Sequence, residues 1–308
     1  MKKIFVVLAF LMVGMLAFGQ SLSGAIESGF KVTSDSTGTK VQQFDWAGGQ
    51  PGWGNVKLKV VSESTSADLV IRSTDYATLS VPSMWITQKY FKDSLKILVG
   101  KTAAGLFATG YNGMGTIDTQ GVVVSYTLPF GLSVGGSVPL TNTLTDISSL
   151  QKYKAAASFN YKGFSLVGIY ENETVPVSTG AISFAKNNVW LGFEVQDAGG
   201  TTFFCPYFDI MLFGDKFEFT FDYNATFQSP IEGSETELWF NYWFKPEFRL
   251  LGRVNYVVDS TQAGGGYLKT REGFVIKPAK NVSVRAQLDS TWKASPTHAL
   301  NVMFQHSF

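Results

Sequence analysis

The residues that could do catalysis are few in this sequence. Gly131, Ser133 and Gly135 match the Gly-x-Ser-x-Gly pattern, which exposes a nucleophilic serine on a tight turn between a strand and a helix. Here the pattern falls within a short alternating segment, and no helical periodicity follows it. Both histidines, His298 and His306, lie in the final segment of the chain. The sequence therefore predicts no catalytic residue and no enzyme.

The sequence does not support a cofactor site or a metal site either. The glycines at 110, 113 and 115 are not preceded and followed by the strand and helix that a dinucleotide-binding fingerprint needs. Two histidines and the single Cys205 do not give the spacing of a metal site or allow a disulfide within the chain. We expect no cofactor and no metal.

Composition excludes further classes of protein. Of the 308 residues 45% are hydrophobic, 15% aromatic and only 16% charged. A disordered chain has few aromatics and a large net charge, so disorder is excluded. The formal charge of +1 does not provide the basic surface typical of nucleic-acid binding.

The N-terminus resembles a targeting segment. Lys2 and Lys3 precede an apolar run from Ile4 to Phe18, and Gly19 supplies a small residue at its end. We expect residues 1–19 to be a signal peptide and residues 20–308 to form the exported domain. A membrane anchor is the alternative, for which the apolar run is short.

Apolar and polar residues alternate through most of the remaining chain. In 216–228 the odd positions hold Phe217, Phe219 and Phe221, and the even positions hold polar residues such as Glu218 and Asp222. A β-strand turns successive side chains to opposite faces, so such segments have one apolar and one polar face. We count about 18 of these strands, with 16 as the alternative, joined alternately by tight turns and by longer connections that include 34–52 and 102–120. The pattern predicts an all-β, antiparallel, up-and-down transmembrane barrel; a secreted β-sandwich is the competing fold.

A closed barrel accounts for the composition because backbone groups in a bilayer must be paired within the protein. Its outer face would contact membrane lipid, and its polar face would surround water. Aromatic residues near strand ends would lie at the membrane interfaces. Candidates are Tyr90, Tyr126, Tyr153, Tyr161, Tyr170, Trp243 and Phe244.

The last strand resembles the C-terminal signature of bacterial outer-membrane proteins. It ends in Phe308, and Leu300, Val302 and Phe304 share one face, with His306 where an aromatic residue is usual. The resemblance implies that Phe304 and Phe308 form an assembly signal for the barrel assembly machinery. It also implies the bacterial outer membrane as the location.

A second resemblance is to the general porins of Gram-negative bacteria. Residues 84–101 (MWITQKYFKDSLKILVGK) and 122–138 (VVVSYTLPFGLSVGGSV) are similar to two porin hairpins. In that family the connection between these hairpins folds into the barrel, which implies that 102–120 is a constriction loop. Its candidate residues are Lys101, Tyr111, Asn112 and Asp118. The resemblance also implies a homotrimer.

Several basic residues would face the lumen on strands near the seam between the first and last strands. They form a candidate basic arc of the pore wall: Lys57, Lys59, Arg72, Arg249, Arg253, Lys269, Arg271 and Arg285. Alternatively, these charges only solvate the interior and pair with Glu27, Asp68, Glu218, Asp222 and Asp289.

The sequence thus favours an outer-membrane porin through which small hydrophilic solutes and ions diffuse passively. One alternative is a substrate-specific channel, for example for sugars, with an inward aromatic track. Its candidates are Trp85, Trp190, Trp239 and Trp292. The other alternative is a structural or adhesive surface barrel without transport.

Overall fold

The computed structural model describes residues 21–44, 53–73, 79–107, 117–139, 152–227, 231–259 and 265–307. Within these ranges, no helix is long and apolar enough to cross a membrane. The strands are β1 (Ser21–Asp35), β2 (Gly38–Phe44), β3 (Trp53–Val61), β4 (Thr65–Ser73), β5 (Leu79–Tyr90), β6 (Leu95–Leu106), β7 (Ile117–Thr127), β8 (Leu132–Pro139), β9 (Lys154–Tyr161), β10 (Phe164–Glu171), β11 (Val177–Lys186), β12 (Val189–Ala198), β13 (Thr201–Leu212), β14 (Phe217–Phe227), β15 (Ile231–Lys245), β16 (Phe248–Asp259), β17 (Gly266–Ala279), β18 (Val282–Trp292) and β19 (Thr297–Ser307).

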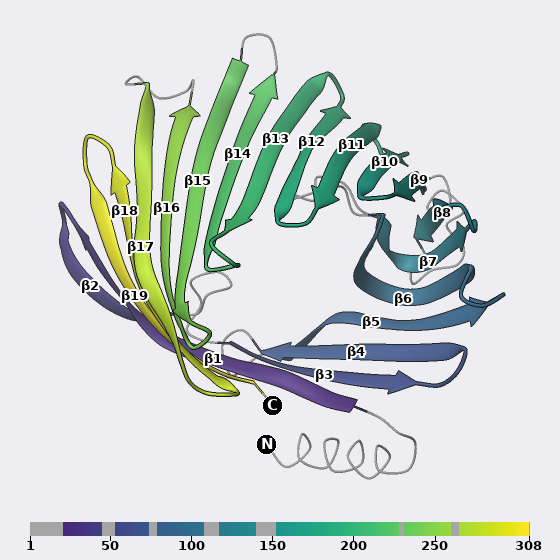
Figure 1. Ribbon diagram of the computed structural model, residues 1–308, viewed down its shortest axis with the longest axis horizontal. Coiled ribbons are helices and arrows are strands. Elements are labelled where there is room, and N and C mark those ends of the chain that lie inside the picture. Colours follow the sequence, from purple (N-terminus) through teal and green to yellow (C-terminus); the bar gives the residue numbers. More distant parts are fainter. Residues whose placement is uncertain are drawn as a thin grey trace.

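The strands form one antiparallel sheet whose pairing returns to its start (Figure 1). From β3 to β19 each strand pairs with the next along the chain, and β1 pairs with β19 along one edge. On its other edge β1 pairs with β2 through residues 29–35 and with β3 through residues 21–27. Because β2 and β3 share one edge of β1, the nineteen strands occupy eighteen positions around the ring. The prediction of an up-and-down barrel of about 18 strands is confirmed.

Two expected connections differ from the prediction. Residues 38–44, expected within a connection, form β2, because the β1 segment turns tightly at Thr37 and pairs with the chain that follows. The stretch 102–120 is partly strand: β6 continues to Leu106 and β7 begins at Ile117, with a register shift between Thr102 and Leu106.

Tight turns gather at one rim of the barrel. Lys162 and Gly163 both have positive φ, at 45° and 91°, which is the backbone of a two-residue turn whose twist matches its strands. Both ends of the described chain lie at this rim, since Ala25 pairs with Ser307 and Ser21 pairs with Lys59, close to the β3–β4 turn. An even number of positions in the ring explains this placement.

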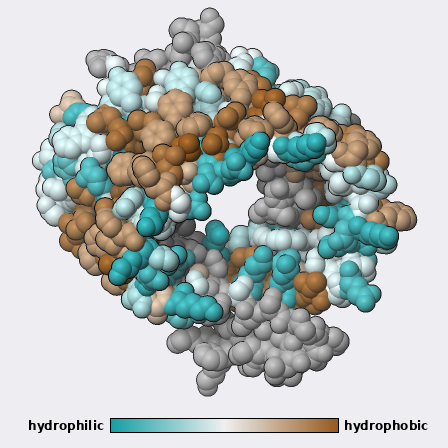
Figure 2. All heavy atoms as spheres, viewed as in Figure 1, coloured by the Kyte–Doolittle hydropathy of each residue, from teal (hydrophilic) through white to brown (hydrophobic). Residues whose placement is uncertain are grey.

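Burial in this fold is the reverse of burial in a water-soluble domain. Glu194 is 0% exposed, and Asp222 and Asn255 are 3% and 2% exposed. By contrast, Phe304 is 51% exposed, on a strand whose polar Asn301 is buried. Figure 2 shows hydrophilic side chains bordering a central opening and hydrophobic ones outside it. The polar face of the sheet is therefore the inner face, and the apolar face is the outer one.

Outward-facing aromatics gather near the rim with the tight turns. Tyr90, Tyr126, Tyr161 and Phe244 are exposed there, close to the ends of their strands. Trp243 differs from the expectation: it pairs in register with the inward residue Arg249, and its ring lies 5.5 Å from that guanidinium. The sequence placed it correctly near a strand end but on the wrong face.

Candidate functional site

The inner wall carries an acidic strip on β13–β15. Alternation directs the carboxylates of these strands inward, and register places Asp222 opposite Glu237 and Asn224 opposite Glu235. Like charges directly opposite one another repel, so the strip needs hydrogen-bond donors beside it. Asn255 on β16 supplies them, because its amide donates to Glu235 and, at 3.0 Å, to Glu237.

Beside this strip, β16–β18 carry basic residues that pair with the acids. Arg253 forms an ion pair with Glu237 and lies 4.7 Å from the Trp239 ring. The Nε of Arg271 donates to Asp289 at 2.5 Å. Lys269 is 3.9 Å from Glu235. These predicted residues of the basic arc are therefore largely neutralised by neighbouring carboxylates.

Three of these basic residues border one cavity of about 300 Å³ that opens on the lumen side. Its lining mixes both signs of charge with hydroxyl groups: Glu235, Arg253, Asn255, Lys269, Thr270, Arg271, Asp289, Ser290 and Thr291. The Oδ1 atom of Asn255 has no hydrogen-bond partner among the described residues. Such a wall offers both donors and acceptors to a polar solute.

A second cavity, of about 290 Å³, has a different charge balance. Its lining contains Arg249, Lys277 and Arg285 and, among the described residues, no carboxylate. The strand register brings the two arginines together, because Arg249 and Arg285 both pair with Val275. The lining of this cavity therefore has a positive excess.

The remaining basic-arc residues lie on β3 and β4, separated from the others by β19 and β1. Lys57 forms an ion pair with Asp68 at 3.3 Å and lies 5.8 Å from the Trp85 ring. Lys59 pairs in register with Asp68, and Arg72 pairs with Asn55. The predicted arc is thus two groups of cations rather than one continuous patch.

Of the proposed constriction residues, the structure describes Lys101 and Asp118. Lys101 pairs with Met84 on the outer face, and its ammonium donates to the Val81 carbonyl at 3.4 Å. Asp118 belongs to β7. Tyr111 and Asn112 lie outside the described residues, as does Phe308 of the proposed assembly signal. Phe304, the other residue of that signal, is exposed on the outer face of β19.

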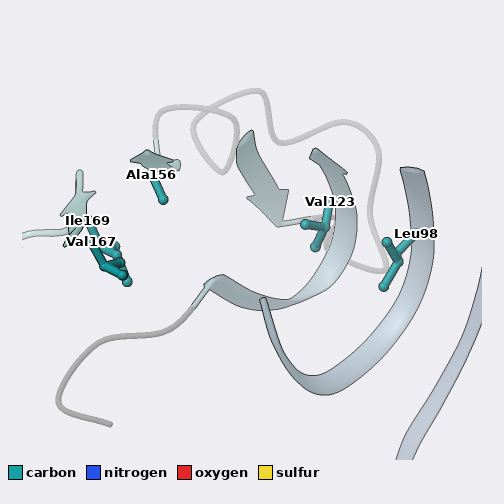
Figure 3. Close-up of a cluster of buried hydrophobic side chains, with 5 residues drawn as sticks. All are labelled: Leu98, Val123, Ala156, Val167 and Ile169. Carbon is teal, nitrogen blue, oxygen red and sulfur yellow. The ribbon is translucent and has the colours of Figure 1, made fainter. Parts of the chain in front are cut away.

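The sequence reasoning missed an apolar patch on the inner wall of β6–β10. This inner apolar patch consists of Leu98, Val123, Ala156, Val167 and Ile169 (Figure 3). Phe107, which follows β6, and Trp85 pack against it. The sequence does contain a sign of this patch, because segments such as 95–101 and 121–124 are apolar on both faces of the strand.

The tryptophans proposed for an aromatic track do not all face the lumen. Trp85, Trp190 and Trp239 pair in register with inward residues. Trp292 pairs with Leu268 on the outer face, because it is an odd number of residues from the inward Asp289. Trp190 lies against Tyr207, with ring centroids 5.3 Å apart.

Comparison with known proteins gives matches at the level of structure. No protein-family model and no curated protein sequence matches the chain. The outer membrane protein OpdK of Pseudomonas aeruginosa superposes with a TM-score of 0.63 at 10% identity, over 93% of this chain and 98% of that one. OpdL of the same organism gives a TM-score of 0.64 at 9% identity, over 94% and 98%.

Two further solved structures support the same fold. A mutant porin of Rh. blastica superposes with a TM-score of 0.56 at 16% identity, over 94% of this chain and all of that one. The outer membrane channel DcaP of Acinetobacter baumannii gives a TM-score of 0.54 at 12% identity, over 94% and 97%. The chain therefore has the fold of the porin-like β-barrels of Gram-negative outer membranes.

Proposed function

We propose that this protein is a porin of the bacterial outer membrane, through which small hydrophilic solutes and ions diffuse passively. The observation that carries the proposal is the reversed burial of a closed ring: charged and amide side chains face inward, and large apolar side chains face outward. An apolar exterior suits hydrocarbon, and a ring of eighteen strand positions is wide enough for an aqueous channel. Transport then needs no covalent chemistry, and selectivity follows from width and wall charge.

The direct test is single-channel conductance of the purified chain in planar bilayers. A water-filled lumen should give stepwise currents that scale with salt concentration. A reversal potential in a salt gradient then reports selectivity. A chain that inserts into the bilayer and carries no current would contradict the proposal and favour a structural or adhesive barrel.

A substrate-specific channel is the second candidate, favoured by the inward rings of Trp85, Trp190 and Trp239. Sugars stack on such rings, so added sugars should reduce the current if the rings form a binding track. A current unaffected by sugars supports the general pore.

Inward folding of the connection after β6 is part of the same proposal. It is supported by Phe107, which packs on the inner apolar patch. The signal peptide 1–19, the assembly signal and a homotrimer remain predictions with their own tests. Cleavage of the signal peptide, for example, would be read from the N-terminus of the exported protein.

A further inference from the structure

Lys269 and Glu235 form a loose ion pair in the mixed-charge cavity of about 300 Å³ on β15–β18. The ammonium of Lys269 lies 3.9 Å from a carboxylate oxygen of Glu235, which is too long for a hydrogen bond. The two side chains are 42% and 37% exposed. Arg271 and Asp289, by contrast, are only 2.5 Å apart in the same cavity. The pair of Lys269 and Glu235 is therefore the one that a solute can open most easily.

The groups around this loose pair are held in place. Asn255 is only 2% exposed, and its amide donates to both Glu235 and Glu237. Arg253 is held by its ion pair with Glu237 and by the Trp239 ring. The buried Oδ1 atom of Asn255 has no hydrogen-bond partner among the described residues, although Asn255 lines the cavity. A fixed frame with one open ion pair and one unused acceptor is preorganised for a ligand.

The loose pair discriminates between solutes by their charge. An anion that binds Lys269 takes this cation away from Glu235 and then faces a like charge. A cation that binds Glu235 does the same to Lys269, and an uncharged solute supplies no charge to either residue. A solute that carries both an ammonium and a carboxylate gives each residue a charged hydrogen-bond partner and leaves the charge of the wall balanced.

We propose that this cavity binds α-amino acids in their zwitterionic form as they pass through the channel. The solute carboxylate binds Lys269, and its ammonium binds Glu235 with Oδ1 of Asn255 as a second acceptor. A single carbon separates the two charged groups of an α-amino acid, so both can reach the neighbouring Lys269 and Glu235. Small-molecule pockets measure roughly 300–1,000 Å³, so this cavity suits one amino acid better than a longer peptide.

The inference rests on the proposed function, because it names a substrate class for the same channel. A diffusion channel needs sites that a solute can also leave. The partial exposure of Lys269 and Glu235 meets this need, because ion pairs that water reaches are weak. The site therefore favours amino acids without trapping them.

Binding of carbon-13-labelled alanine to the detergent-solubilised full-length protein tests this inference. Broadening of the alanine signals in nuclear magnetic resonance spectra should saturate with alanine concentration. Propionate and ethylamine each lack one of the two charged groups, and both should compete about tenfold less well. Lys269→Met and Glu235→Gln should each weaken alanine binding by about tenfold, because each removes a hydrogen bond between charged groups.

Lys154→Met is the matched control for these variants. It removes a lysine that forms an ion pair with Glu171 at 2.8 Å on β9 and β10, away from the cavity. This variant should bind alanine as the wild type does. Loss of alanine binding in Lys154→Met equal to that in Lys269→Met would overturn the inference, because any lysine of the barrel would then serve.

Single-channel recording separates this inference from the proposed function. Alanine should reduce the wild-type current saturably, and the reduction should disappear in Lys269→Met at the same alanine concentration. A barrel that conducts and binds no alanine, equal competition by propionate or ethylamine, or alanine binding unchanged in Lys269→Met and Glu235→Gln would overturn the inference and leave the pore intact. Alanine binding that both variants weaken, in a barrel that carries no current, would support the site and contradict the pore.

Discussion

The ring of Phe107 occupies the space where a side chain at Gly135 would stand. A Cβ built on Gly135 would lie 2.7 Å from Cε2 of Phe107. Phe107 also has a φ of 58°, a conformation that a bulky residue rarely adopts. Such strain persists where surrounding contacts hold it, and here the inner apolar patch supplies those contacts.

We therefore predict that Phe107 fixes the path of the chain where it leaves β6. Phe107→Ala removes the ring that packs on the patch, so the chain at residue 107 should be held less firmly at the inner wall. Single-channel recordings should show noisier current with a changed mean conductance.

Gly135→Val should also change the current, because its side chain takes the space of the ring and its Cβ would come within 2.7 Å of the Val124 carbonyl oxygen on β7. Phe130→Ala, at an exposed tight turn, is the matched control and should conduct as the wild type does. Recordings of Phe107→Ala identical to those of the wild type would show that this contact does not shape the channel.

Much of the barrel could be predicted from alternation alone, and its inner contacts could not. The odd–even pattern in 216–228 assigns Phe219 outward and Asp222 inward because the period of a strand is two. The pairing of Arg253 with Glu237 depends on cross-strand register, which turn lengths and bulges set and which no single segment reveals. The inner apolar patch was missed because a residue such as Leu98 breaks the expectation that the lumen side is polar.

The positively charged cavity should set anion preference. Arg249 and Arg285 line it together with Lys277, and no carboxylate is among its lining residues within the described part of the chain. Replacing Arg249 and Arg285 together by Ala should shift the permeability ratio towards cations by roughly twofold or more, because local potential concentrates counter-ions. Reversal potentials in a salt gradient measure this shift.

A charge-neutral change serves as the control for that experiment. Arg271→Gln with Asp289→Asn removes one cation and one anion that already pair at 2.5 Å. The permeability ratio of anions to cations in this double variant should stay close to the wild-type value. An equal shift in both variants would mean that wall charge does not determine selectivity.

Asn255 should be a stability determinant of the acidic strip. Asn255→Leu removes the amide donor shared by Glu235 and Glu237, and the loss of a hydrogen bond to a charged group costs about 1.5–3 kcal/mol. The free energy of unfolding in lipid vesicles, from urea titration, should fall by that amount. The control is Asn188→Leu, which removes an exposed hydrogen bond to Asp215. It should change the free energy of unfolding by only about 0.5 kcal/mol.

The tight turns offer a comparison of two glycines that both have positive φ. At Gly163, with a φ of 91°, an added Cβ would collide with the Ala185 carbonyl, which belongs to the neighbouring strand. At Gly214, with a φ of 65°, an added Cβ would meet nothing within 4 Å. Gly214→Ala should therefore lower the free energy of unfolding by about 1–2 kcal/mol through backbone strain alone. Gly163→Ala should lower it further, because β10 and β11 must also separate locally. Equal losses in the two variants, measured by the same urea titration, would show that the collision relaxes without cost.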